Sequence, residues 1–347
     1  MTILSSREEE KDAAGPAQAG RNIGRPDGGW RPLFIIMNAG SGLDNAVAAR
    51  ENVARLMSEV DQPYEMLLCR RPRELSAMAE RAAEQAARHN GIVVAAGGDG
   101  TIRTVAQLVL AAGLPFGVLP QGTFNYFARD NGLPADPVTA AAALVAGVRA
   151  GSERLVQVGQ LNDQIFLVNA SLGLYPQLLE DREVFKQRYG RSRMVAKWSG
   201  LLTLLRRDTE MLLRLEYSDR QQAHGADVMR ACTLFVGNNA LQLDQVGLTE
   251  GQGAPGGQLV ALVLPPMNVA ERLIIAMRGM LGQLGSAPNT AQFFCRHLIV
   301  EPLARAQRRQ VKVAMDGESA WMRPPLVFRV APRPLRLVVP PSGWSAA

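Results

Sequence analysis

The segment at residues 91–101 most constrains the fold of this 347-residue chain, because an apolar run of strand length ends there in a glycine-rich turn. The turn reads Gly97-Gly98-Asp99-Gly100-Thr101. Glycines can take positive φ and bring backbone N–H groups close to anionic oxygens, and a helix that follows them points its N-terminus the same way. A carboxylate in such a turn indicates phosphoryl chemistry through a cation or a proton, although the pattern alone also fits a plain tight turn.

Two more apolar runs end in glycine-containing loops, at Asn38-Ala39-Gly40-Ser41-Gly42 and at Gly122-Thr123-Phe124-Asn125. Apolar runs alternate with helix-period segments from Leu33 onward, which predicts a doubly wound α/β domain with its loops on the carboxyl edge of a parallel sheet. The expected strands are 33–37, 64–68, 92–96 and 116–119, and the expected helices are about 44–60, 73–89, 101–112 and 136–149.

The pattern predicts three parts in the chain. Residues 1–30 are polar and rich in Gly and Pro and are expected to be a disordered extension, and residues 31–150 form the α/β domain. Residues 151–347 are expected to form a β-sandwich-like second domain with helical interruptions near 192–206 and 268–283. Its expected strands are 155–161, 164–170, 211–217, 228–236, 258–264, 293–300, 311–315 and 326–330.

Composition excludes several classes of protein. The net charge is +6, but none of the four lysines follows a glycine, which excludes a P-loop, and aromatic residues at 5% are too sparse for nucleic-acid stacking. No apolar run approaches the roughly 18 residues of a membrane span, and the N-terminus predicts no secretory signal. Three scattered cysteines suit a reducing compartment, and Cys295-Arg296-His297 is expected to lie on one strand rather than bind a metal.

The four motifs at Asn38–Gly42, Gly97–Thr101, Gly122–Asn125 and Asp316–Glu318 resemble, in this order, those of the diacylglycerol kinase catalytic family. That family includes bacterial lipid kinases and sphingosine kinases, and the resemblance runs from about residue 31 to the C-terminus. It implies an NAD-kinase/diacylglycerol-kinase-like α/β nucleotide-binding domain, a second β-rich domain, and ATP with Mg²⁺ as cofactors.

The resemblance also implies the residues that bind the nucleotide. Asn38 and the amides of 39–42 would cradle part of it, and Gly97, Gly98, Gly100 and Thr101 would hold the polyphosphate. Thr123 would offer a hydroxyl to a phosphate oxygen, and Arg193 resembles a phosphate-binding arginine of sphingosine kinases, although a solvated basic helix end is equally expected. Asn125 is expected either to bridge the loops or to cap a helix. The nucleotide-binding residues are Asn38, Ala39, Gly40, Ser41, Gly42, Gly97, Gly98, Gly100, Thr101, Thr123 and Arg193.

Phosphoryl transfer to an alcohol needs a proton acceptor. Glu318 is the first candidate, with Asp316 as its partner, and Asp99 is the rival; otherwise Asp99 acts as the metal ligand. Taken alone, Asp316-Gly317-Glu318 also fits a hairpin turn. Two departures from the family are visible. The acids of a structural magnesium site are absent from 255–259, and Cys69 stands where the family usually has threonine.

We therefore expect an ATP-dependent, magnesium-requiring kinase that phosphorylates a hydroxyl of diacylglycerol or a similar lipid, as in phospholipid synthesis. It is expected in the cytoplasm, at the inner face of the membrane through the basic and apolar region 186–207, and without a nucleic-acid partner. A homodimer is left open. The alternatives are a soluble-substrate kinase of NAD-kinase-like architecture and a catalytically weak nucleotide- or lipid-binding protein.

Overall fold

The structure is a computed structural model that describes residues 18–22, 29–39, 46–173, 210–218, 224–238, 257–266, 271, 291–304 and 309–345. The chain divides into two units. Unit 1 comprises Met1–Thr123, Leu133–Arg154 and Arg336–Ala347, and unit 2 comprises Phe124–Gly132 and Leu155–Leu335. The expected boundary lay between residues 150 and 151. The observed units are instead discontinuous in sequence, because residues 124–132 belong to unit 2 and the end of the chain returns to unit 1.

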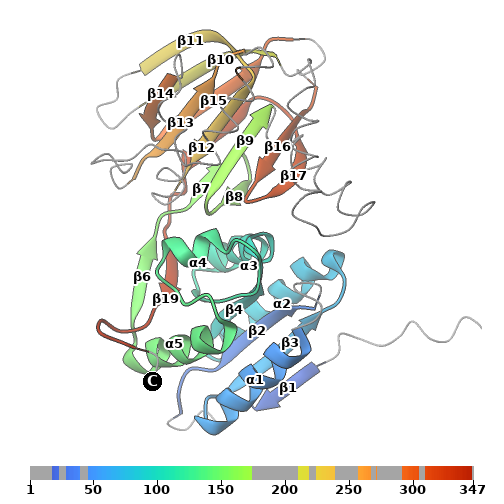
Figure 1. Cartoon of the computed structure of the whole chain (residues 1–347), viewed down its shortest axis with the longest axis vertical. Coiled ribbons are helices and arrows are strands. Elements are labelled where there is room, and N and C mark those ends of the chain that lie inside the picture. The colour runs from blue at the N-terminus through green and yellow to red at the C-terminus, as the bar shows by residue number, and fades with distance from the viewer. Residues whose placement is uncertain are drawn as a thin grey trace, which may run out of the picture. The chain divides into compact units, whose positions relative to one another are not determined.

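Unit 1 is built on a seven-stranded sheet of the order β1-β3-β2-β4-β5-β19-β6 (Figure 1). The strands are β1 (Gln18–Asn22), β2 (Leu33–Asn38), β3 (Tyr64–Cys69), β4 (Ile92–Gly97), β5 (Pro115–Pro120), β6 (Glu153–Val156) and β19 (Leu335–Val338). Strands β3, β2, β4 and β5 are parallel neighbours, as expected, and β19 joins them parallel to β5. The C-terminal strand was not anticipated, because its sheet neighbours β5 and β6 both lie far earlier in the chain.

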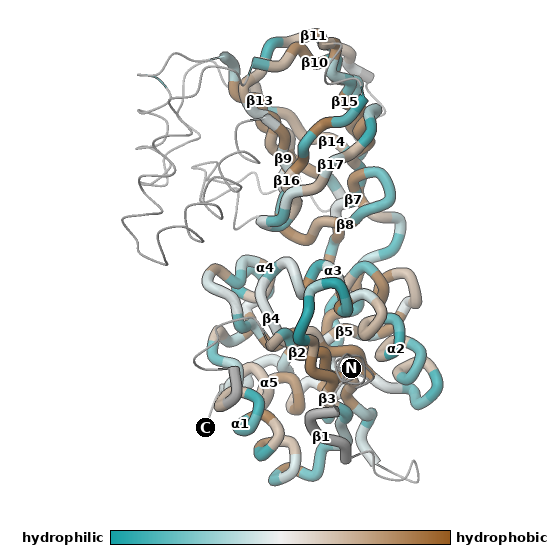
Figure 2. The backbone as a smooth tube through the Cα atoms, turned by 90° about the vertical axis from the view of Figure 1, so that its right-hand side faces the viewer, coloured by the Kyte–Doolittle hydropathy of each residue, from teal (hydrophilic) through white to brown (hydrophobic). Residues whose placement is uncertain are grey.

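The helices of unit 1 cover both faces of this sheet. They are α1 (Ala46–Glu59), η1 (Pro72–Glu74), α2 (Leu75–Arg88), α3 (Asp99–Ala112) and α5 (Pro137–Ala150). Helices α1 and α5 bury apolar side chains against alternate residues of β2 and β4, in one core cluster. Helices α2 and α3 contact each other and the same strands outside that cluster. The strands are therefore buried on both faces, as parallel strands usually are, and the central strands are predominantly brown in Figure 2.

Part of the expected disordered extension is ordered. Residues Gln18–Asn22 form β1, which pairs antiparallel with β3 and extends the sheet by one strand. The polar and glycine-rich composition of this segment hid the strand, because an edge strand obtains its stability from backbone pairing with a neighbour that is distant in sequence.

Unit 2 contains α4 (Tyr126–Asp130) and two six-stranded sheets. One sheet has the order β11-β10-β15-β18-β7-β8, and the other has the order β14-β13-β12-β9-β16-β17. Their strands are β7 (Gly159–Leu161), β8 (Gln164–Phe166), β9 (Asn169–Gly173), β10 (Met211–Ser218), β11 (His224–Ala231), β12 (Thr233–Gly237), β13 (Leu259–Leu264), β14 (Ala291–Cys295), β15 (His297–Pro302), β16 (Val311–Met315), β17 (Glu318–Met322) and β18 (Leu326–Val330). Both sheets contribute to a single core cluster, which agrees with the expected β-rich second domain.

Two expected strands of this unit are each divided in two. The expected strand 228–236 is divided at Cys232 into β11 and β12, and the expected strand 293–300 is divided at Arg296 into β14 and β15. In both cases the two halves belong to different sheets, so one apolar run passes from sheet to sheet around the shared core. Cys295 and His297 consequently lie on different strands, and the expectation of one strand through them was wrong.

The expected helices at 192–206 and 268–283 lie outside the described residues, apart from residue 271. In the part of the chain that the structure describes, no helix is both long enough and apolar enough to cross a membrane.

Candidate functional site

Three loops of unit 1 meet at the carboxyl edge of its sheet. Strands β2, β4 and β5 are parallel, so the residues that follow Asn38, Gly97 and Pro120 all emerge at one edge. The backbone N–H of Gln121 donates to the carbonyl oxygen of Gly97 at 2.8 Å, which ties two of these loops together. The carboxyl edge of such a sheet is where α/β proteins bind their ligands.

Of the two glycines at the end of β4, Gly97 is required for space, whereas a side chain at Gly98 would make only ordinary contact. A Cβ atom on Gly97 would lie 2.7–2.8 Å from three side-chain atoms of Thr101, and one on Gly98 would lie 3.5 Å from the Cα of Gly122. The expectation that these glycines adopt positive φ was wrong for Gly98, which has φ −83° and ψ 177°, and neither Gly97 nor Gly100 is among the positive-φ residues. Close packing against Thr101 in the first turn of α3, rather than an unusual backbone conformation, explains Gly97.

Helix α3 begins directly at this edge. Gly98 occupies its N-cap position without a side-chain cap, and Asp99 is its first residue. The first N–H groups of a helix have no partner within the helix, so they can bind an anion. Asp99 and Gly100 are half-buried there. An acid in the first turn is also favourable for the helix dipole, so Asp99 has a structural role that is independent of any metal.

Asn38 and Thr101 are brought together from different loops. The Nδ2 atom of Asn38, at the end of β2, donates to the Oγ1 atom of Thr101 in the first turn of α3, at 3.0 Å. Thr101 is buried, and its hydroxyl proton can still be donated. This bond fixes the side chains of two predicted nucleotide-binding residues relative to the glycine turn.

Ala39 differs from its expected role. Its backbone N–H donates to the carbonyl oxygen of Cys69 at 2.9 Å, so this amide is already used by the end of β3. The Sγ atom of Cys69 donates to the carbonyl oxygen of Arg71 at 3.2 Å, and burial raises the pKa of this thiol. The family threonine is thus replaced by a thiol that is kept protonated and bonded to its own loop.

Several predicted residues lie outside the described residues, namely Gly40, Ser41, Gly42 and Arg193, together with the basic region 186–207. Thr123 is exposed and is the last residue of the first segment of unit 1. Asn125 occupies the N-cap position of α4, as one of the two expectations had it, in a left-handed conformation with φ 50°, but its side chain makes no capping bond.

In unit 2, Asp316 and Gly317 form the tight turn between β16 and β17. Both residues have positive φ, 48° and 86°, as two-residue hairpin turns require. The buried Asp316 carboxylate accepts three backbone N–H bonds, from Leu167 at 2.7 Å, Val168 at 2.9 Å and Asn169 at 3.1 Å. Asp316 therefore anchors the hairpin to the segment that leads into β9.

Glu318 begins β17 directly after this turn, where it pairs with Met315 and is exposed. The anchoring of Asp316 thus determines where the Glu318 carboxylate lies within unit 2. The sequence predicted Asp316 only as the partner of Glu318; its anchoring role was missed, because the signal for it is the set of amides from residues 167–169.

The donor set of unit 1 suits a nucleotide that arrives with its own metal. Among the described residues, no group of three or more His, Cys, Asp or Glu side chains could hold a metal ion. Magnesium usually binds one or two carboxylates together with the phosphates of a substrate, and Asp99 is the carboxylate at the glycine turn. The close-packed glycines and the uncapped start of α3 fit the phosphates.

Comparison with known proteins agrees with this geometry. Residues 32–160 match the diacylglycerol kinase catalytic domain family, which confirms the resemblance seen in the motifs. The chain is 29% identical over 253 residues to the diacylglycerol kinase of Bacillus subtilis, covering 71% of this chain and 77% of that protein. It is also 29% identical over 260 residues to a Pseudomonas aeruginosa protein named "Probable lipid kinase YegS-like", covering 72% and 76% of the two chains.

The fold is shared with solved structures. A crystal structure of a diacylglycerol kinase from Bacillus anthracis str. Sterne aligns with a TM-score of 0.61 at 15% identity, covering 90% of this chain and 98% of that chain. At this identity the likeness concerns the fold alone: an α/β domain followed by a sheet-rich domain.

Proposed function

We propose, from the premise that residues 32–160 belong to the diacylglycerol kinase catalytic domain family, that this protein is an ATP-dependent kinase acting on a hydroxyl of diacylglycerol or a similar lipid. The observation that carries the proposal is the convergence at the carboxyl edge of the unit 1 sheet. There, Gly98 packs against Gly122 beside an uncapped helix start, as a phosphate-binding site requires.

In this proposal the loops of unit 1 bind and orient ATP. The amides at the start of α3 and the hydroxyl of Thr101, which Asn38 holds in place, bind phosphate oxygens. Gly97 and Gly98 allow the backbone to approach them closely. Asp99 would hold the magnesium ion that accompanies ATP, and bound magnesium would neutralise charge on the transferring phosphoryl group.

Glu318 is the proposed proton acceptor. It would take the proton from the acceptor hydroxyl as the oxygen attacks the terminal phosphorus and the bond to the leaving diphosphate breaks. Asp316 is a positioning residue in this scheme, because three backbone amides hold its carboxylate. Asp99 remains the rival base.

A lipid acceptor has to be taken from a bilayer, so the proposal includes reversible attachment to an anionic membrane surface. The arginine-rich composition and the net charge of +6 support it. Co-sedimentation with liposomes should increase with the anionic lipid fraction and decrease with salt. Binding that responds to neither would contradict this part of the proposal.

The decisive experiment is a transfer assay with ATP labelled at its terminal phosphate, purified protein, and a panel of acceptors comprising diacylglycerol, other long-chain lipid alcohols and NAD. The proposal expects label in a lipid product, with magnesium required. Label in NAD alone would establish the soluble-substrate kinase instead. Absence of label from every acceptor, with ATP still bound, would favour the nucleotide-binding alternative.

A further inference from the structure

Gln121 is partly buried at the carboxyl edge of the unit 1 sheet, and the polar atoms of its side chain have no hydrogen-bond partner. Both of its polar atoms, Oε1 and Nε2, are inaccessible to solvent, and neither makes a hydrogen bond. The residue directly follows β5, and its backbone N–H is bonded to the carbonyl oxygen of Gly97. Its neighbour Gly122 packs against Gly98. Gln121 therefore lies where two of the predicted phosphate loops meet.

Comparison with a second buried glutamine of unit 1 shows what is unusual. Gln62 is fully buried and its Oε1 atom also lacks a partner, but its Nε2 atom donates to the carbonyl oxygens of Arg31 at 2.9 Å and Pro63 at 3.3 Å. Gln62 thus stabilises the chain through its amide. Gln121 loses the hydration of a whole carboxamide on folding and regains no bond for it, so it destabilises the protein unless a ligand provides the partners.

The carboxamide also restricts the chemistry of that ligand. It presents one acceptor and two N–H donors, so its full partner must donate a hydrogen bond and accept one. Phosphate oxygens only accept hydrogen bonds, so phosphate by itself would leave Oε1 unpaired. The nucleoside half of a nucleotide offers suitable groups in two places, the ribose hydroxyls and the base edge, where adenine presents an amino donor beside a ring-nitrogen acceptor.

We propose that Gln121 binds the nucleoside half of the nucleotide through both atoms of its carboxamide, and so contributes to selection of the phosphoryl donor. This inference rests on the proposed function, since it assumes that the carboxyl edge holds a nucleotide. It assigns a role to a residue for which the glycine pattern carries no signal, because glutamine beside a glycine loop is indistinguishable in sequence from a surface residue.

The test compares Gln121→Leu with Gln62→Leu, because each substitution replaces a glutamine carboxamide by an apolar side chain. In the ligand-free protein, Gln121→Leu should leave the melting temperature unchanged or raise it, whereas Gln62→Leu should lower it by a few degrees. By calorimetric titration, Gln121→Leu should weaken binding of magnesium ATP about tenfold and leave binding of inorganic tripolyphosphate unchanged. Gln62→Leu should bind both like the wild type.

Two analogues identify the group that is bound. If the carboxamide binds the ribose, wild type should lose about tenfold in affinity for 2′- or 3′-deoxy-ATP while Gln121→Leu loses nothing further. If it binds the base, purine riboside triphosphate, which lacks the amino group, should give that pattern instead.

Unchanged ATP affinity in Gln121→Leu, an equal loss for tripolyphosphate, or a fall in melting temperature like that of Gln62→Leu would each overturn the inference alone. A wild-type protein that binds no nucleotide would overturn the proposed function with it.

Discussion

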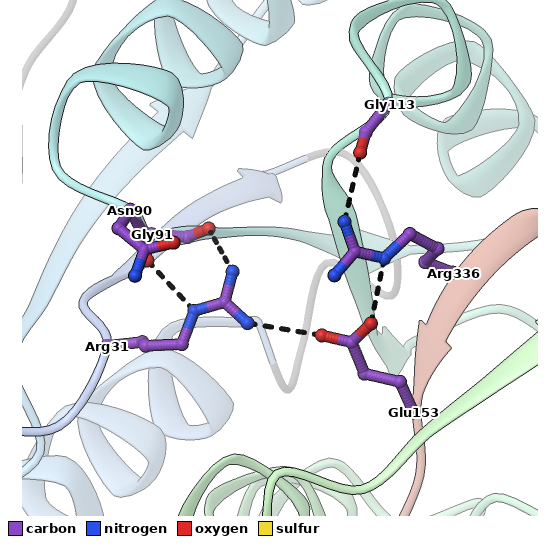
Figure 3. Close-up of polar contacts among 6 residues, drawn as sticks. All are labelled: Arg31, Asn90, Gly91, Gly113, Glu153 and Arg336. Atoms are coloured by element: carbon purple, nitrogen blue, oxygen red, sulfur yellow. Dashed lines mark hydrogen bonds and ion pairs between the residues drawn. The ribbon is translucent and has the colours of Figure 1, made fainter.

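The two edges of the unit 1 sheet differ in how their polar groups are partnered. At the amino edge, Glu153 bridges two arginines, with Arg31 at 3.1 Å and Arg336 at 2.9 Å (Figure 3). Arg31 also donates to the carbonyl oxygens of Asn90 and Gly91 just before β4, and Arg336 donates to that of Gly113 just before β5. This cluster joins the start of the domain, the β6 strand and the C-terminal strand.

At the carboxyl edge the sheet ends differently. Positions 97 and 98 are glycines, and the start of α3 lacks a side-chain cap. The polar atoms of the Gln121 carboxamide are buried without partners. Groups that stabilise the fold are paired within the chain, whereas groups that await a ligand are left in place at a cost in stability. The same sheet is thus closed at one edge by its own chain and prepared at the other edge for a second molecule.

The largest expected effect concerns the proton acceptor, which decides whether the carboxyl edge also carries the base. Glu318→Gln should lower kcat by a factor of roughly 10²–10⁴ with little change in ATP affinity, because loss of a general base affects the transition state alone. Asp99→Asn should weaken magnesium ATP binding as well as turnover. Steady-state kinetics with nucleotide titrations would measure both. The opposite pattern would make Asp99, at the carboxyl edge, the base.

The next largest effect should follow from filling the carboxyl edge. Gly97→Ala places a methyl group against Thr101, so the glycine turn must shift, and kcat/KM for phosphoryl transfer should fall by roughly 10- to 100-fold. Gly113→Ala, at the other end of α3, is the control: its φ of 68° strains alanine by about 1 kcal/mol, but there is open space around it. It should melt lower and transfer phosphate normally. If both variants lost kcat/KM equally, the carboxyl edge would be no more important for transfer than the other end of α3.

At the amino edge, Glu153→Ala should reduce stability without changing turnover. It leaves Arg31 and Arg336 without their carboxylate, and because all three side chains are partly exposed the cost should be only about 1–2 kcal/mol in the free energy of unfolding. Denaturant unfolding gives this value, and kcat per folded molecule should equal that of wild type. Glu51→Ala, which removes the exposed pair with Arg50, should change stability by less than about 0.5 kcal/mol. A lowered kcat in Glu153→Ala would show that the amino edge communicates with the site.

The smallest effect sharpens the comparison at two helix starts. Helix α5 is capped by Asp136, whose Oδ2 atom accepts from the backbone N–H of Thr139 at 2.8 Å, while α3 has no such cap. Asp136→Ala should cost about 1 kcal/mol and leave nucleotide binding intact. The bonds from Thr139 lower the pKa of Asp136, so its contribution is present above the ordinary pKa of about 4 and is lost as pH falls through the lowered value. Thermal melts of both proteins between pH 7 and acid, about pH 2, should therefore converge.

Local signals account for what could be predicted in unit 1. The bounds of β2–β5 and of α1, α2, α3 and α5 agree with the expected segments to within about two residues. Apolar periodicity and a glycine at a helix C-terminus, such as Gly113, are signals that depend only on residues nearby in sequence. The glycine turn and the identity of Asn38, Thr101 and Asp99 as its companions followed in the same way. Hydrogen-bond partners were not predicted: the Ala39 amide donates to Cys69, and Asn125 lies at the N-cap position of α4 without a side-chain capping bond.

The sequence by itself determined the order of most strands and helices, the position of the glycine turn, and the resemblance to the diacylglycerol kinase catalytic family, since these depend on periodicity and on short motifs. Tertiary structure decided that β19 returns to the first sheet, that the runs near Cys232 and Arg296 pass between two sheets, and that Asp316 is an anchor. It also decided that the Nε2 atom of Gln62 is paired and that of Gln121 is not. The physical reason is that a hydrogen-bond partner tens to hundreds of residues away leaves no trace in local composition, whereas a strand, a turn or a helix start does.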